Sequence, residues 1–247
     1  MCRRRTGVVN RMRRIIADIH THTIASGHAY GTIREMAQAA AEKRLEILGL
    51  TEHAPGIPGT VDPFYYMNLR AVPRTLYGVQ ILHGCEINVL NDGSLSLEQR
   101  FIDKLDYAIA GIHTLCYKDE GRKKNAENIA AYMHHPKVKF VSHPDDDHTP
   151  LNYELLVQAA RDTGTALEIN DSSLRKPQDR LNCFENYRHM LVLCRQAEVP
   201  VILSSDAHDP SAVGRFDLAE ALVESVSFPE ELILNNDPKK LLDFLLQ

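Results

Sequence analysis

The sequence has no apolar stretch long enough to cross a membrane and no cysteine pair with metal-site spacing. A membrane-spanning helix needs about 18 or more consecutive apolar residues, and every apolar run in this chain is shorter. The basic start of the chain is not followed by the apolar segment of a secretory signal. These absences favour a cytoplasmic protein without a membrane partner.

Cysteine is scarce and irregularly placed, with five residues and no C-x-x-C pair. An odd number of widely spaced cysteines argues against a disulfide framework and against a thiolate zinc site. Cys85 lies beside Glu86, and in an extended strand its side chain points to the opposite face. We therefore expect free thiols, with Cys85 acting as a small buried side chain.

Length and composition predict a single globular domain over residues 15–247. The chain has 247 residues, of which 44% are hydrophobic and 25% are charged, and barrel folds occupy this length as one unit. Residues 1–14 carry six arginines and no acidic residue, so the rest of the chain is more acidic than the formal charge of −5 indicates. Since this segment is short and lacks aromatic residues, we expect a basic, disordered arm and no nucleic-acid partner.

Six apolar runs end in residues of the kinds that bind metal ions. The run at 15–17 leads to His20 and His22, and the run at 201–203 leads to Asp206 and His208. Side chains two residues apart lie on one face of an extended strand, so each pair can converge on one ion. The runs at 45–50, 79–82, 107–110 and 138–141 lead in order to His53, Glu86, His113 and His143.

Helical patterns alternate with the apolar runs, which predicts an α/β fold. Seven strands are expected, beginning at Ile15 and at 45–50, 79–84, 107–112, 138–142, 166–169 and 199–203. A capping-box pattern at Thr32 and Glu35 opens a helix that runs to Lys43. Further helices are expected from Leu97, from about Asn125, over 152–162 and over 184–197. Repeated strand–helix units predict a parallel sheet closed, or nearly closed, into a barrel with its reactive groups at the carboxyl ends of the strands.

Seven histidines and two carboxylates are expected to face one crater at that end of the barrel. They are His20, His22, His28, His53, His113, His143 and His208, with Glu86 and Asp206. Neutral imidazoles packed together without a metal ion would leave many polar groups unpaired. Imidazole with a few carboxylates and no thiolate suits zinc, and also manganese or iron(II). The other five histidines, His83, His134, His135, His148 and His189, are predicted to be surface or packing residues.

Ordered motifs along the chain resemble those of the PHP (polymerase and histidinol phosphatase) superfamily. They are Asp18-x-His20-x-His22, Thr51-x-His53, Glu86, His113, Ser142-His143-Pro144 and Ser205-Asp206-x-His208. The stretches 20–30, 167–173 and 228–235 further resemble the stand-alone bacterial phosphatases of the YcdX type. The resemblance implies a distorted (βα)7 TIM-like barrel, a site for three metal ions and, more weakly, a trimer.

The same resemblance implies how the ligands divide. His20, His22, Glu86 and Asp206 would hold one ion, Glu86 would bridge to a second held by His113 and His143, and His28, His53 and His208 would hold the third. We expect three zinc ions, with manganese or iron as alternatives, and Glu86, Asp206 and His208 as catalytic residues. The chain departs from the family at Glu52, where aspartate is usual, and at 145–149, where the loop is more acidic.

The expected reaction is hydrolysis of a small phosphomonoester by a hydroxide bridging two divalent ions. Four residues after the sixth strand could donate hydrogen bonds to the phosphorylated substrate: Asn170, Ser172, Ser173 and Arg175. A helix cap and a solvated loop explain these four residues equally well. Three loops, at 55–68, 144–150 and 171–182, are expected to set specificity for the substrate. The loop at 55–68 is expected to form a lid over the crater.

Three other functions stay open. An amidohydrolase-type enzyme would cleave a carbon–nitrogen bond, but such sites usually recruit a carbamylated lysine and no lysine here ends a strand. A phosphodiesterase or nuclease is disfavoured because no basic, aromatic-lined groove is indicated. A non-catalytic metal-binding module is disfavoured by the complete ligand set.

Overall fold

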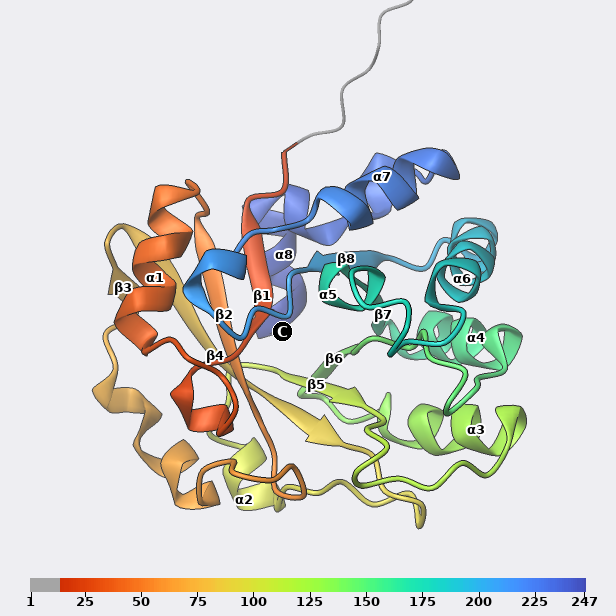
Figure 1. The fold of residues 1–247 in the computed structure, drawn as a ribbon, viewed down its shortest axis with the longest axis horizontal. Coiled ribbons are helices and arrows are strands. Elements are labelled where there is room, and N and C mark those ends of the chain that lie inside the picture. The colour runs from red at the N-terminus through yellow and green to blue at the C-terminus, as the bar shows by residue number, and fades with distance from the viewer. Residues whose placement is uncertain (1–13) are drawn as a thin grey trace, which may run out of the picture.

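A nearly closed barrel of parallel strands forms the centre of the protein, as a computed structural model of residues 14–247 shows (Figure 1). Its seven strands run in the order β1 (Ala17–Thr21), β2 (Ile47–His53), β4 (Val79–Asn88), β5 (Ala108–Gly111), β6 (Val138–Val141), β7 (Ala166–Asn170) and β8 (Val201–Ser204). All six pairings between them are parallel. The predicted fold class, an α/β (βα)7 TIM-like barrel, is therefore confirmed.

One short strand lies outside the predicted set. β3 (Thr75–Leu76) pairs antiparallel with the start of β4 through a tight turn in which Tyr77 and Gly78 have φ of 51° and 82°. Two residues are too few to show an alternating pattern in the sequence, so the prediction missed this strand.

Helices surround the barrel. They are α1 (Ile33–Glu42), α2 (Gln99–Ile102), α3 (Arg122–Tyr132), α4 (Tyr153–Thr163), α5 (Asp171–Leu174), α6 (Cys183–Ala197), α7 (Asp217–Ser225) and α8 (Pro238–Leu246). The connections also contain the 3-10 turns η1 (Ile24–Ser26), η2 (Pro63–Ala71), η3 (Pro210–Ala212), η4 (Glu230–Leu232) and η5 (Leu234–Asn236). The capping box is confirmed, since Thr32 accepts from the Glu35 amide and Glu35 accepts from the Thr32 amide. The third helix begins at Arg122, earlier than the predicted Asn125.

Two apolar layers fix the barrel. Inward-facing residues near the amino ends of the strands fill its interior, among them Ala17, Ile47, Ile109, Phe140, Ala166 and Ile202. Leu241 and Leu245 of α8 pack against this layer and close the barrel at its amino end. Outward-facing strand residues pack under the helices, and Figure 1 shows α1 on one side and α3, α4 and α6 on the other. Only the carboxyl end of the barrel is left for the polar crater.

The gap between β1 and β8 is bridged by polar contacts instead of a continuous ladder. Asn235 donates from Nδ2 to the carbonyls of Ala17 (2.9 Å) and Leu203 (2.6 Å) and accepts from the Leu203 amide. Beyond it, the His22 amide donates to the Ala207 carbonyl at 2.8 Å. These contacts hold β1 and β8, and the segments that follow them, together where the two strands form no ladder.

The predicted basic arm lies outside the described residues, except for Arg14, which donates to the Lys43 carbonyl. The single domain over residues 15–247 stays a prediction. No helix within residues 14–247 has the length and apolar character needed to cross a membrane.

Candidate metal centre

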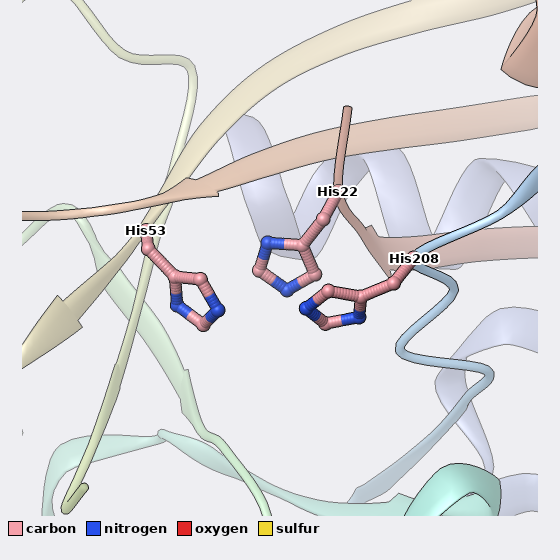
Figure 2. Close-up of side chains that lie close together, drawn as sticks. All are labelled: His22, His53 and His208. Atoms are coloured by element: carbon pink, nitrogen blue, oxygen red, sulfur yellow. The ribbon is translucent and has the colours of Figure 1, made fainter. Parts of the chain in front are cut away.

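All nine predicted ligands lie at the carboxyl end of the barrel. His20, His53 and Glu86 lie within β1, β2 and β4, and His22, His28, His113, His143, Asp206 and His208 lie in the segments that follow strands. Figure 2 shows the rings of His22, His53 and His208 pointing toward one another from three separate segments. The ligand atoms of these three residues lie within 4.8 Å of one another.

One group of four matches the ligand set that the family resemblance implies for the first ion. Nε2 of His20 lies 3.4 Å from Oε2 of Glu86 and 3.6 Å from Oδ1 of Asp206. Nε2 of His22 lies 3.6 Å and 3.2 Å from the same two oxygens. Ligands about 2.0–2.1 Å from a tetrahedral zinc ion are about 3.3 Å apart, so these separations fit a single ion.

The imidazole tautomers of His20 and His22 support this fit. Nδ1 of His20 faces a carboxylate oxygen of Glu168 at 2.6 Å and must donate to it. Nδ1 of His22 donates to Oγ of Ser26 at 2.9 Å, because that hydroxyl gives its own proton to Glu52 at 2.6 Å. In the neutral rings, both Nε2 atoms therefore present lone pairs, and they lie 3.1 Å apart. Two facing lone pairs repel unless a proton or a metal ion lies between them, and a metal ion can take the place of the proton.

Glu86 lies between the group of His20, His22 and Asp206 and the group of His53, His113 and His143. Its Oε1 lies 2.7 Å from Nε2 of His143 and 3.3 Å from Nε2 of His113, and its Oε2 lies 2.9 Å from Nδ1 of His53. Two oxygens that face different histidines suit a bridging ligand. The 2.9 Å contact between Oε2 of Glu86 and Nδ1 of His53 lacks hydrogen-bond geometry, and within residues 14–247 neither atom has a hydrogen-bond partner. The outer nitrogens of the other two rings, Nδ1 of His113 and of His143, are also buried without a hydrogen-bond partner there.

The remaining histidines form a stack at the crater mouth. The ring of His28 lies 4.9 Å from that of His53 and 4.8 Å from that of His208, and Nε2 atoms of His28 and His208 are 3.1 Å apart. Two further triplets combine residues that the resemblance assigns to different ions. His53 lies close to Glu86 and His113, and His22 lies close to His53 and His208. The sets therefore share residues and are not cleanly separate.

Burial and charge set the protonation of the crater. Burial lowers the pKa of His22 well below 6.5 and that of His113 to about 4, so both rings are neutral at pH 7. Burial also disfavours the charged form of His20, but the carboxylates of Glu168, Glu86 and Asp206 hold its pKa above 6.5. Burial opposes ionisation of Glu86 and Asp206, yet the surrounding histidines hold both pKa values well below the ordinary range. Neutral rings and ionised carboxylates are the forms that bind metal ions, so His22, His113, Glu86 and Asp206 are ready to bind, whereas His20 must first give up a proton.

Two candidate ligands have strained backbones. His143 and Asp206 have positive φ, at 29° and 49°, which is rare for residues with a side chain. Such strain persists only where surrounding contacts fix it, and it is common at functional sites.

Three carboxylates support the crater without being predicted as ligands. Glu168 accepts from His20 and from the His143 amide, and Asp18 accepts from the amides of Ser205 and Gly214. Glu52, which stands where the family usually has aspartate, accepts hydrogen bonds from Thr23 and Ser26. Both of its carboxylate oxygens therefore have donors. The signal for Glu168 in the sequence is a charged residue inside an otherwise apolar run.

The predicted substrate-binding residues have mixed surroundings. Asn170 donates to Asp206 at 3.2 Å and caps α5, and Ser172 and Ser173 are buried in that helix. Arg175 pairs with Asp171 at 2.6 Å and with Asp217, so its charge is used within the protein. The cations that line the crater are instead two residues that the prediction missed, Lys176 and Arg180.

The crater has two lobes. A pocket of about 340 Å³ contains the predicted ligands His28, His53, Glu86, His113, His143, Asp206 and His208 together with Lys176 and Arg180. A second pocket of about 230 Å³ shares His113, His143 and Arg180 with the first and is walled by side chains such as Leu115, Asp146 and Leu151. The predicted specificity loops at 144–150 and 171–182 both line these lobes. The 55–68 loop, predicted as a lid, braces the end of β2, where Thr60 donates to the His53 carbonyl.

Two of the five histidines that were predicted to be surface or packing residues lie apart from the nine candidate ligands. His148 is half-exposed and pairs with Asp146 at the wall of the second lobe, and His83 is buried away from the cluster. The Cys85 thiol is buried beside Tyr66, to which its Sγ donates at 3.1 Å. All four described cysteines are free thiols.

A barrel with histidines and carboxylates gathered at the carboxyl ends of its strands defines a class of metal-dependent hydrolases. Within this class, the chain belongs to the PHP domain family, whose model matches residues 18–226. A protein of Clostridium novyi (strain NT) named probable phosphatase is 38% identical over 231 residues, which cover 93% of this chain and 94% of the relative. A probable phosphatase of Thermoanaerobacter sp. (strain X514) is 35% identical over 240 residues, with 94% and 95% covered. The predicted family and enzyme class, a phosphoric ester hydrolase, are confirmed.

Solved structures share the fold at low identity. Histidinol phosphate phosphatase from Lactococcus lactis, solved with zinc, L-histidinol and phosphate, is 16% identical with a TM-score of 0.59, and 87% of this chain and 95% of that chain are covered. A chain in the structure of an archaeal ribonuclease P with mature tRNA is 18% identical with a TM-score of 0.61, and 92% and 90% are covered. The fold thus occurs in proteins of different function, so the reaction must be argued from the site.

Proposed function

We propose that this protein is a metal-dependent phosphatase that hydrolyses a small phosphomonoester at a site for three zinc ions, with manganese or iron(II) as alternatives. The observation that carries the proposal is a single pocket that contains seven of the nine candidate ligands and two cationic side chains, Lys176 and Arg180. The probable phosphatases among the relatives and the zinc and phosphate of the Lactococcus lactis structure support it.

We assign the ligands to the three ions as the family resemblance implies, with the groups adjoining one another where His22 and His53 lie close to more than one of them. His20, His22, Glu86 and Asp206 would hold one ion, Glu86 with His113 and His143 a second, and His28, His53 and His208 the third. When bound, divalent ions supply Lewis acidity and lower the pKa of a coordinated water toward about 7. Glu86 and Asp206 keep the negative charge that such ions need, and Asn170 fixes Asp206 by donating to its Oδ2.

The two cations would bind the phosphoryl group. Lys176 is exposed at the pocket, and Arg180 lies with one guanidinium nitrogen 3.4 Å from Oδ1 of Asp145. Arginine and lysine donate charge-assisted hydrogen bonds to phosphate oxygens, which offsets the acidic character of the loop at 145–149. Asn170, Ser172 and Ser173 would contribute to substrate binding because they lie near this edge of the crater. Arg175 would contribute indirectly, because it holds α7 through Asp217.

The second lobe would accept the organic part of the ester. It shares Arg180 with the metal lobe and adds apolar side chains such as Ile112 and Leu151. Its volume of about 230 Å³ favours a small molecule over a polymer. A carbon–nitrogen hydrolase is disfavoured because the only lysine in the described strands, Lys139, lines a surface pocket with Phe244 of α8, far from the crater.

Release of inorganic phosphate tests the proposal. The purified protein should hold two to three transition-metal ions per chain and hydrolyse p-nitrophenyl phosphate or other small phosphomonoesters. Activity should disappear after chelation and return with Zn²⁺ or Mn²⁺. His208→Ala should abolish most turnover, while Cys85→Ser, on the opposite face of β4, should leave it nearly unchanged. If the metal-loaded protein matches His208→Ala on a broad panel of monoesters and diesters, the phosphatase proposal is wrong.

A further inference from the structure

Glu168 is a fully buried carboxylate in β7, at the centre of the candidate metal centre. Its Oε1 lies 2.6 Å from Nδ1 of His20 and also accepts from the Ser204 hydroxyl. Its Oε2 accepts from the His143 amide at 2.5 Å and from Nδ2 of Asn170 at 3.2 Å. Four segments of the barrel therefore meet at one side chain.

All four partners of Glu168 donate. The amide of His143 and the Nδ2 group of Asn170 are donors by their chemistry, the Ser204 hydroxyl can turn to donate, and Nδ1 of His20 faces an ionised acceptor. A carboxylate has about four acceptor positions, so it satisfies every one of these groups.

Two of these partners are candidate ligands of different ions. Donation from Nδ1 of His20 leaves the lone pair of its Nε2 for a metal ion, 3.4 Å from Oε2 of Glu86. The bond to the His143 amide holds a residue with φ of 29°, whose Nε2 lies 2.7 Å from Oε1 of Glu86. Glu168 is thus linked to both sides of the bridging carboxylate.

We propose that Glu168 is a positioning residue that fixes the tautomer of His20 and the backbone of His143, and so couples two metal subsites. A histidine ligand commonly needs such an acceptor on its outer nitrogen, and loss of the acceptor weakens metal binding about 10- to 100-fold. The inference rests on the metal ligation within the proposed function, and it does not depend on which ester is hydrolysed.

Glutamine is the informative replacement because it keeps the shape and changes one acceptor into a donor. If its amino group faces His143, it meets a backbone N–H that cannot reverse. If it faces His20, Nδ1 must accept and the ring proton moves to Nε2, the atom that the metal ion needs. Either arrangement disturbs a candidate ligand.

The test compares Zn²⁺ binding by competition with a chromophoric chelator, together with the visible absorption of the Co²⁺-substituted protein. We expect Glu168→Gln to bind at least one ion about 10- to 100-fold more weakly and to change the Co²⁺ absorption bands. Asp171→Asn is the matched control, since Asp171 is a buried acid that accepts from the Leu218 and Ala219 amides and touches no candidate ligand. This control should keep the affinity and the spectrum of the wild type.

A purely structural role for Glu168 would lower the unfolding temperature of the chelated protein and leave Zn²⁺ affinity and Co²⁺ absorption unchanged. That result would overturn the proposal. If Glu168→Gln does not fold, Glu168→Asp decides, because the shorter acid cannot reach both His20 and His143 and should alter the spectrum. A wild-type spectrum and affinity in Glu168→Asp would then contradict the inference. A protein that binds zinc normally but hydrolyses no ester would refute the phosphatase proposal and leave this test intact.

Discussion

Replacing Glu86 by glutamine removes a carboxylate whose two oxygens face different histidines. Oε1 lies 2.7 Å from Nε2 of His143, and Oε2 lies 3.4 Å from Nε2 of His20. Glu86 would therefore supply one ligand atom to each of two ions. Zinc bound by four protein ligands gains about 10–16 kcal/mol, or about 2.5–4 kcal/mol per ligand. Glutamine keeps one oxygen and loses the charge, so both ions should be weakened, and the ion that loses its ligand atom should be weakened by roughly 10²- to 10³-fold.

The assay is a Zn²⁺ titration of the chelated protein against a competing chelator, with phosphatase activity measured at each point. Glu86→Gln should show two weakened ions and need excess Zn²⁺ for any turnover. Cys85→Ser is the matched control. Cys85 is next to Glu86 in the sequence, but its side chain is buried against Tyr66 on the other face of the same strand. Equal affinity for every ion in Glu86→Gln and in the wild type would refute the bridging role.

Three further predictions concern substrate, pH and packing. Lys176→Met should raise KM for a phosphomonoester about 10-fold or more with a smaller change in kcat, and unchanged steady-state kinetics would remove Lys176 from phosphate binding. Burial lowers the pKa of His83 to about 4, so the folded protein binds fewer protons than the unfolded chain between pH 6.5 and 4, and stability falls as the pH drops through that window. His83→Gln should remove about 2 kcal/mol of this loss by pH 5, and urea unfolding curves with the same pH dependence as the wild type would contradict it. Gly49→Ala would place a methyl group 2.0 Å from the Tyr107 hydroxyl and should cost about 1–3 kcal/mol in urea unfolding, whereas an unchanged midpoint would show that the interior can adapt.

The seven strands and the candidate ligands could be predicted because both leave local signals. Apolar runs followed by histidine or carboxylate mark the carboxyl ends of strands, and Thr32 and Glu35 mark a helix start within four residues. His28 follows the turn η1 and no apolar run, so its role as a ligand was predicted from the resemblance of the stretch 20–30 to the family. The structure brings it to within 3.1 Å of His208.

Other features depend on contacts between distant segments, which local patterns do not contain. Asn235 closes the barrel by bonding to β1 and β8, and Glu168 acts on residues 20, 143 and 204. Arg175 follows the sixth of the predicted strands as expected, but its guanidinium is held by Asp217 of α7, a helix that the sequence prediction did not include. The crater cations Lys176 and Arg180 were missed for the same reason.

Anomalous X-ray scattering at the zinc edge, from crystals grown with Zn²⁺, tests the central claim most directly. We expect anomalous peaks in the crater, including one between the Nε2 atoms of His20 and His22 and one between Glu86 and His143. A crater without an anomalous peak, in a protein that elemental analysis shows to contain zinc, would contradict the metal centre and with it the proposed reaction.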